Sequence, residues 1–255
     1  MNDERLEYHR SFANLTFADF RLRADDKRLT PNEKVGFPRE YRDGLTGLIF
    51  GDILSKLPAI KDPGSTVLDI GCGCGDLAHH LIQNAAQLNQ HLALIDSEEM
   101  LDAITAHDSV RKFAGEFPSD CDAFIQTNKG QMQSILVYSV IQYVFIEGSL
   151  FSFLDACLAL LAPGGRCLLG DIPNRSMRDR FFYSETGARS HREFTNSTSN
   201  PQIEPFQLTP NLLDDSIVMA LVNRARSAGF HAFIMPQDPN LPMANRREDI
   251  LIVRP

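Results

Sequence analysis

The chain has 255 residues and a formal net charge of −8, which is enough length for one large α/β domain or for a domain with a substantial cap. The acidic balance argues against a nucleic-acid partner, because extended nucleic-acid surfaces are usually basic. The lack of a run of about eighteen apolar residues and the polar, acidic start argue against a membrane partner and a secretory signal, and five irregularly spaced cysteines favour a reducing cytoplasm over a disulfide framework.

Helical patterns dominate the first part of the chain. Thr16 is predicted to start one helix. Thr30 is predicted to start a second, because it is followed by a proline at the first helical position and by Glu33, which completes a capping box. We predict that residues 1–60 form a helical cap, which either covers a sheet edge or places the segment 36–42 beside a ligand pocket. The third predicted helix has an apolar face formed by Leu45, Leu48, Ile49 and Ile53.

A glycine-rich turn, with glycines at positions 71, 73 and 75, connects a predicted buried strand to a helix. Glycine adopts positive φ and has no Cβ, so the backbone N–H groups of such a turn can approach a ligand closely. Asp69 lies in the apolar strand just before the turn, where a carboxylate is costly unless a partner hydrogen-bonds to it. A dinucleotide fingerprint would need glycine where Asp76 stands. The spacing therefore argues against an NAD-binding turn.

A second acid ends the next predicted strand, residues 91–95. Asp96 follows the glycines by about twenty residues, the distance at which nucleotide-binding folds place an acid on the ribose hydroxyls. Alternatively, Asp96 caps the helix that begins near Ser97. The two roles are compatible.

Residues 134–171 are predicted to form a strand, a helix and another strand. The run 134–140 has the composition of a central buried strand, and the strand 166–171 ends at Asp171. Between them, the sequence A-P-G-G at 162–165 stops the helix, because proline cannot continue it and glycine supplies a left-handed turn. The helix face is formed by Phe151, Leu154, Leu158 and Leu161.

The regular hydrophobic patterns of helices and strands are absent between residues 173 and 211. Connections of this length inside a compact domain more often have a function than not. The segment is either a solvated insertion or a substrate lid whose arginines meet a phosphate or carboxylate. After it, Asp214 or Asp215 caps a helix, and two closing strands are expected to pair antiparallel. The basic and aromatic residues of the segment are Arg175, Arg178, Arg180, Phe181, Phe182, Tyr183, Arg189, His191 and Arg192.

The spacing D-x-G-x-G-x-G from Asp69 to Gly75 resembles the first motif of class I S-adenosylmethionine-dependent methyltransferases. The leucine-rich helix closed by P-G-G, with the strand after it, is similar to a later region of the same family. The resemblance covers about residues 65–171. It implies an α/β fold with a Rossmann-like, seven-stranded, mostly parallel sheet, an antiparallel last strand, and helices on both faces beside the N-terminal helical cap. Residues 61–255 would then form the methyltransferase domain, with 173–211 as a substrate-lid insertion.

The resemblance also implies the cofactor and its site. S-adenosyl-L-methionine would lie against the glycine turn, with Asp96 on its ribose and the loop at 115–118 beside its adenine. The predicted cofactor-binding residues are Asp69, Gly71, Cys72, Gly73, Gly75, Asp96, Ser97, Glu116, Phe117 and Tyr138. No metal is predicted, because Cys72 and Cys74 belong to the turn and their spacing to His79 and His80 does not suit a zinc site.

Methyl transfer is an in-line displacement that needs alignment, and a base if the acceptor must lose a proton. Ligands in such sheets bind outside the carboxyl ends of the strands, where Tyr138 and Asp171 are expected. We predict Asp171, His191 and Tyr138 as catalytic candidates, with Gln142 and Tyr143 orienting the acceptor. Alternatively, Asp171 caps a turn and His191 is a solvent-exposed side chain.

The acceptor is predicted to be a small polar molecule. Asp171–Asn174 and Tyr138–Tyr143 look similar to bacterial methyltransferases of surface-glycan biosynthesis, which suggests a sugar or an anionic metabolite. Two other hypotheses remain at this point: a non-catalytic cofactor-binding or assembly module, and an NAD-dependent oxidoreductase. A homo-oligomer is compatible with the sequence.

Overall fold

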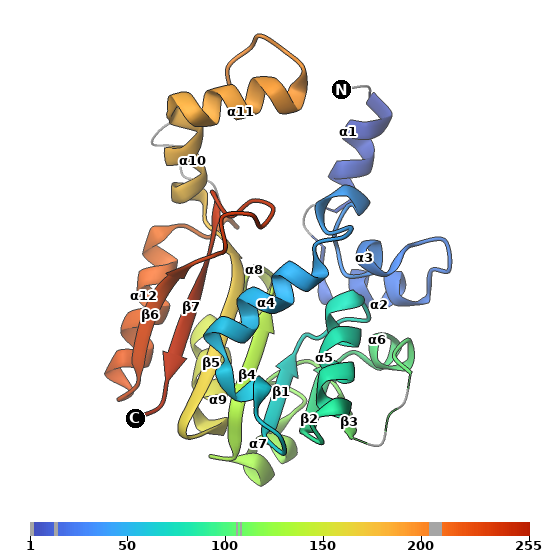
Figure 1. Ribbon diagram of the computed structural model, residues 1–255, viewed down its shortest axis with the longest axis vertical. Helices are drawn as coiled ribbons and strands as arrows, with labels where there is room; N and C mark the ends of the chain where they lie inside the picture. Colours follow the sequence, from blue (N-terminus) through green and yellow to red (C-terminus); the bar gives the residue numbers. More distant parts are fainter. Residues whose placement is uncertain (1–2, 13–14, 106, 108, 204–210) are drawn as a thin grey trace.

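The structure is a computed structural model, and it describes residues 3–12, 15–105, 107, 109–203 and 211–255. Its centre is a seven-stranded sheet in the order β3-β2-β1-β4-β5-β7-β6 (Figure 1). The strands are β1 (Thr66–Ile70), β2 (His91–Asp96), β3 (Val110–Ala114), β4 (Met132–Tyr138), β5 (Leu161–Pro173), β6 (His231–Pro236) and β7 (Arg247–Val253). Strands β1 to β5 pair in parallel, whereas β7 is antiparallel to β5 and β6. The predicted fold class is confirmed.

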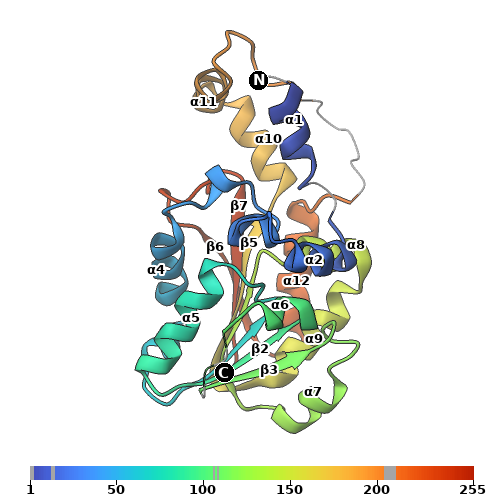
Figure 2. The same ribbon diagram turned by 90° about the vertical axis from the view of Figure 1, so that its right-hand side faces the viewer.

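Helices cover both faces of the sheet, as Figure 2 shows. Helices α4 and α5 pack on one face, and α7, α9 and α12 pack on the other. The helices are α1 (Asp3–Arg10), α2 (Phe17–Asp25), α3 (Pro31–Lys34), α4 (Thr46–Lys56), α5 (Asp76–Gln87), α6 (Glu98–Asp102), α7 (Asp122–Asn128), α8 (Ile141–Glu147), α9 (Leu150–Leu160), α10 (Arg175–Tyr183), α11 (Glu185–Thr195) and α12 (Asp215–Ser227), with 3₁₀ turns η1 (Arg39–Tyr41) and η2 (Pro58–Lys61).

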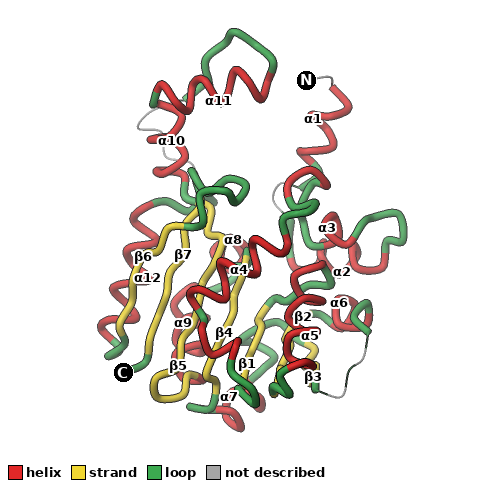
Figure 3. Tube along the Cα trace, viewed as in Figure 1, coloured by secondary structure: helices red, strands yellow, loops and turns green. Residues whose placement is uncertain are grey.

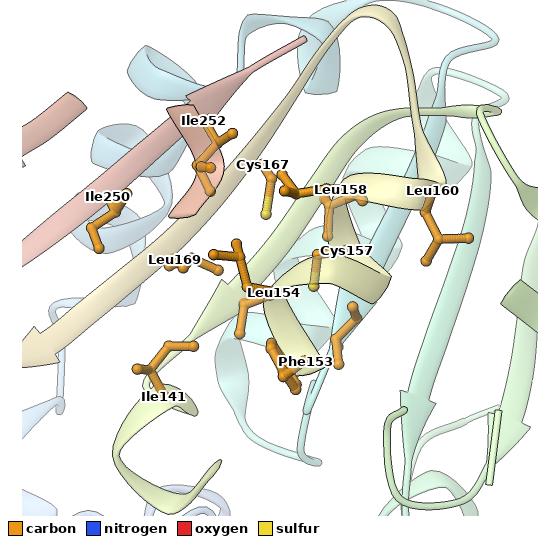
Figure 4. Packing of buried hydrophobic residues seen from close by; sticks show 14 of the residues in the cluster. Ile141, Phe153, Leu154, Cys157, Leu158, Leu160, Cys167, Leu169, Ile250 and Ile252 are labelled. Atoms are coloured by element: carbon orange, nitrogen blue, oxygen red, sulfur yellow. The ribbon is translucent and has the colours of Figure 1, made fainter. Parts of the chain in front are cut away.

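The sheet separates two apolar cores. Successive residues of a strand point to opposite faces, so Leu68 of β1 enters one core while Val67 enters the other. In the first core, Leu154 of α9 packs among Cys167 and Ile250 of the sheet (Figure 4). Burial on both faces explains why the central strands read as nearly continuous apolar runs.

The N-terminal segment forms helices and loops, and its two predicted helix starts are confirmed. Thr16 and Thr30 each accept the N3 backbone N–H, while Asp19 and Glu33 return the reciprocal bond that completes a capping box. No strand occurs in residues 3–12 or 15–61. Residues 1–2 and 13–14 of the predicted cap lie outside the described part of the chain.

The segment 173–211 differs from the sequence prediction, because it contains two helices rather than an irregular connection. Asn174 caps α10 and Ser184 caps α11. Neither helix buries a large apolar residue, so neither has the apolar stripe from which a helix is predicted. Helix α11 projects beyond the end of the sheet (Figures 1 and 3). Residues 204–210 lie outside the described residues.

Two strands also differ from expectation. Strand β3 was not predicted, because Arg111 and Lys112 interrupt its pattern at a partly exposed sheet edge. Strand β5 begins at Leu161 instead of Arg166, so the P-G-G sequence that stops α9 lies inside the strand. Among the described residues, no helix combines the length and hydropathy needed to cross a membrane.

Candidate functional site

A cavity of about 590 Å³ opens at the carboxyl ends of β1, β2 and β4. Its wall combines the glycine turn, the loop after β3, helix α8 and several residues of the N-terminal segment. The predicted cofactor residues in this wall are Asp69, Gly71, Cys72, Gly73, Gly75, Asp96, Glu116, Phe117 and Tyr138. In open α/β sheets, the crevice outside the carboxyl ends of the strands is where ligands bind.

Two residues of the turn have conformations that require glycine. Gly71 and Gly73 have φ of +70° and +59°, a region that costs other residues energy. A Cβ on Gly71 would lie 2.6 Å from Val140 Cγ2, and a Cβ on Gly73 would lie 2.5 Å from Val35 Cγ1. The turn is therefore packed tightly between α8 and the N-terminal segment.

Asp96 holds this turn in place. Its Oδ2 accepts a hydrogen bond from Gly73 N at 2.7 Å, and its Oδ1 accepts one from Ser97 N at 2.7 Å. The cap of α6 is Ser97, whose Oγ accepts from Met100 N at 3.3 Å. Ser97 thus supports the helix and does not line the cavity, whereas Asp96 lines the cavity and fixes the turn.

The wall next to the turn carries two buried carboxyl groups with raised pKa values. Burial, and then the charge of Asp96, raise the pKa of Asp69 to about 8. Burial also raises the pKa of Asp96 to about 6, although its two backbone donors oppose the shift. The Asp69 carboxyl has no hydrogen-bond partner among the described residues. A cationic or hydrogen-bond-donating ligand would relieve both costs.

We expect the contribution of these two acids to stability to fall as pH rises from about 4 to about 8 in the ligand-free protein. Both groups titrate near 3.8 when exposed, and near 6 and 8 when folded. Between these values the folded state binds more protons than the unfolded state, so the free energy of unfolding decreases with pH. Urea unfolding across this range measures the slope, and Asp69→Asn should flatten its upper part. An identical slope in that variant would contradict the assignment.

The predicted adenine and acceptor residues occupy other parts of the wall. Glu116 and Phe117 follow β3, and Phe117 packs edge-on against Phe153 with 5.2 Å between ring centroids. Tyr143 of α8 lines the cavity, whereas Gln142 donates from Nε2 to Ser139 O at 2.7 Å and does not line it.

Asp171 lies next to the cavity, in a buried polar cluster. Its Oδ2 accepts hydrogen bonds from Arg42 at 3.1 Å, from Arg247 at 2.8 Å and from the Ser139 hydroxyl. Gln237 Nε2 donates a hydrogen bond to Asp171 Oδ1 at 3.3 Å. Arg42 and Ser139 line the cavity, so Asp171 contacts the wall from behind.

The structure does not bring His191 to the cavity wall. His191 lies on α11, where its ring centroid is 6.1 Å from that of Phe182. The third catalytic candidate, Tyr138, lines the cavity, and burial raises the pKa of its hydroxyl well above the ordinary range. Tyr138 is therefore placed as a neutral hydrogen-bond donor.

Sequence reasoning predicted Asp171 but missed the buried ion pairs behind Ser139 and Asp171. Ser139 and Asp171 both have positive φ, +61° and +58°, which is uncommon outside glycine and is often found at functional sites. Behind them, Lys56 binds Asp249 at 2.7 Å and Asp52 at 2.6 Å. Asp249, which directly precedes the apolar run 250–253 of β7, was the signal that the sequence offered for this group.

No known family profile matches the chain. It is 31% identical over 130 residues to the chondramide synthase cmdD of Chondromyces crocatus, covering 49% of this chain and 3% of that protein. It is 29% identical over 123 residues to the ubiquinone biosynthesis O-methyltransferase of Psychrobacter cryohalolentis, covering 47% of this chain and 45% of that protein. The matched part therefore spans less than half the length of either relative.

Solved structures match over most of the chain. The plantazolicin methyltransferase BpumL in complex with SAH has a TM-score of 0.56 and 13% identity, covering 98% of this chain and 96% of that chain. The phosphoethanolamine N-methyltransferase 2 of Haemonchus contortus in complex with S-adenosyl-L-methionine has a TM-score of 0.54 and 13% identity, covering 95% and 61%. The chain thus has the Rossmann-like fold of S-adenosylmethionine-dependent methyltransferases, and the predicted resemblance is confirmed in the fold.

Proposed function

We propose that this protein is an S-adenosylmethionine-dependent methyltransferase that acts on a small polar acceptor. The observation that supports this most is the glycine turn in the wall of a cavity large enough for a nucleoside. The turn is fixed by Asp96 and flanked by Asp69, which has no hydrogen-bond partner within the described part of the chain. The fold alone would not support a methyltransferase function, because one fold hosts many functions.

The charge of the wall fits a cationic cofactor. Five acids line the cavity, whereas Arg42 is its one lysine or arginine among the described residues. The turn and Asp69 would hold the amino-acid part, Asp96 the ribose hydroxyls, and Glu116 and Phe117 the adenine. When bound, S-adenosylmethionine supplies a methyl group on a positively charged sulfur. The five acids that line the cavity wall are Asp69, Asp76, Asp96, Glu116 and Glu147.

The protein's contribution to such a transfer is alignment and exclusion of water. Effective alignment can be worth about 7–11 kcal/mol of the barrier. The predicted cap supports exclusion, since Phe17, Phe20 and Phe37 line the cavity and Arg21 ties α2 to Glu99 of α6 at 2.7 Å. We propose the same closing role for the 173–211 insertion.

The three catalytic candidates would have different roles. Tyr138 touches the cavity directly and would orient the acceptor by donating a hydrogen bond. Asp171 would act as a base only when the bond from Arg42 or Arg247 opens. His191 would act only when α11 moves towards the cavity. Tyr138 therefore fits an orienting role rather than that of a proton acceptor, and neither Asp171 nor His191 could act as the base without a rearrangement. The five free cysteines agree with the proposed cytoplasmic location.

Equilibrium binding of S-adenosylmethionine and NAD tests the proposal. Isothermal titration of the full chain should give binding of S-adenosylmethionine and none of NAD. The reverse result would replace the methyltransferase by an oxidoreductase. Binding of neither compound would remove the proposed cofactor site.

Asp96→Ala should weaken S-adenosylmethionine binding by about 1–3 kcal/mol, the range for a lost hydrogen bond to a charged group. This corresponds to an increase in Kd of about 5- to 150-fold. The matched control is Glu98→Ala, which removes an exposed carboxylate two residues away at the start of α6 and should leave Kd unchanged. An unchanged Kd in Asp96→Ala would show that the ribose contact is misassigned.

A further inference from the structure

Four arginines form a continuous group at the end of the sheet where β5 ends and β7 begins. The guanidinium carbons of Arg42 and Arg247 lie 3.5 and 5.9 Å from the ring centroid of Phe37. Those of Arg246 and Arg178 lie 5.1 and 5.2 Å from the ring centroid of Phe182. We call Arg42, Arg247, Arg246 and Arg178 the arginine row.

The chain connections explain why these residues meet. Arg247 pairs with Pro173 across β5 and β7, and the backbone N–H of Asn174 donates to Arg246 O at 3.0 Å. Asn174 caps α10, so Arg178 and Phe182 rise directly above the start of β7. Figures 1 and 2 show α10 at this end of the sheet.

The arginine row contains more positive charge than its acidic partners neutralise. Arg42 and Arg247 share a single carboxylate oxygen of Asp171. Arg178 binds Asp179 at 3.0 Å, and Asp179 also binds Arg175 at 2.6 Å. Among the residues that the structure describes, four guanidinium groups therefore face two carboxylates, one of which is shared with a fifth arginine.

Arg246 is the member without an acidic partner among the described residues. Its Nε donates to the neutral side-chain oxygen of Asn245 at 3.1 Å, and its two Nη groups have no hydrogen-bond partner in the described part of the chain. Burial lowers the pKa of Arg246; the nearby Tyr41 opposes this shift, and Arg178 and Arg247 add to it. Such a guanidinium is stabilised when an oxyanion binds it.

We propose that the arginine row binds an oxyanion, a phosphate or a carboxylate, carried by the methyl acceptor. The proposal rests on the proposed function for the identity of the ligand as an acceptor. The row meets the cavity at Arg42, which lines the wall and shares Asp171 with Arg247. The acidic part of the cavity around the glycine turn thus connects, through Arg42, with a basic region just outside the cavity wall. This separation places a cationic cofactor and an anionic acceptor at different ends of one site.

Binding of inorganic phosphate and of acetate tests the proposal, because both probes carry the shared chemistry. Titrations of the full chain at constant ionic strength should detect binding of at least one probe. Arg246→Gln should weaken that binding about tenfold or more, as expected for a lost charge-assisted hydrogen bond. A stronger response to phosphate than to acetate would assign a phosphorylated acceptor, and the reverse would assign a carboxylate.

Arg180→Gln is the control, since Arg180 lies on α10, as Arg178 of the row does, but is ion-paired with Asp215. It should bind both probes as the wild type does. Equal binding in wild type and Arg246→Gln, an equal loss in Arg180→Gln, or no binding to the wild type would overturn the proposal. Circular dichroism of each variant establishes that the fold is retained.

Titration of S-adenosylmethionine in the same samples separates this proposal from the proposed function. Arg246→Gln should bind S-adenosylmethionine with unchanged Kd, because Arg246 does not line the cavity. If the wild type binds phosphate through Arg246 but does not bind S-adenosylmethionine, the oxyanion site stands and the methyltransferase proposal fails.

Discussion

Lys56→Met is expected to lower the free energy of unfolding by about 3–5 kcal/mol, the cost of removing one partner from a buried ion pair. Lys56 Nζ lies 2.6 Å from Asp52 Oδ2 and 2.7 Å from Asp249 Oδ2. The side chains of Lys56, Asp52 and Asp249 are 5%, 7% and 0% exposed. Without the ammonium group, two carboxylates remain close together with little water to solvate them.

Urea unfolding at neutral pH measures this loss. The control is Lys61→Met, which removes an exposed lysine from the neighbouring turn η2 and should change the free energy of unfolding by less than about 0.5 kcal/mol. The double variant Lys56→Met, Asp249→Asn should recover part of the stability, because one buried charge is removed with its partner. A loss below about 1 kcal/mol in Lys56→Met would mean that water enters the cluster and solvates the carboxylates.

The same cluster supports the site. Asp249 Oδ1 accepts from the backbone N–H of Asp171 at 2.8 Å and from Gln237 Nε2 at 3.1 Å. Asp171 in turn contacts Ser139 and Arg42 at the cavity wall. A chain of polar contacts therefore connects α4 and β7 with the carboxyl ends of β4 and β5.

The parts of the site that sequence predicted are those encoded within short segments. The glycine turn, Asp69 and Asp96 are recognisable because spacing along the chain fixes their relation to one strand and one helix. The capping box at Thr30 is local for the same reason. Long apolar strands such as β4 are predicted well because both of their faces are buried.

The parts that sequence missed depend on contacts between distant segments. Lys56 and Asp249 are 193 positions apart, and nothing near either residue indicates its partner. The contact of Arg246 with Phe182 forms only because the fold places α10 above the start of β7. The fold places Phe17 and Phe20 of α2 in the cavity wall, which their positions in the sequence do not indicate. Apolar residues of a pocket and of a core follow the same pattern along a helix.

Gly71→Ala is expected to weaken S-adenosylmethionine binding more than Asp96→Ala does. Alanine at φ +70° costs about 1–2 kcal/mol, and overpacking against Val140 adds about 1–3 kcal/mol. The turn can avoid both costs only by shifting away from α8, which changes the shape of the cavity that Gly71 and Val140 both line. The bound state must reverse that shift, so Kd should rise at least about 30-fold.

Isothermal titration of S-adenosylmethionine measures this effect, and two variants separate its causes. Gly51→Ala makes the same chemical change in α4, where a Cβ meets nothing within 4 Å, so Kd should not change. Gly71→Ala combined with Val140→Ala removes the contact with the valine methyl groups but keeps the positive φ. Its Kd should lie between those of the wild type and Gly71→Ala. If Gly71→Ala alone binds as the wild type does, the turn does not contact the cofactor, because a displaced backbone in contact with it could not leave the affinity unchanged.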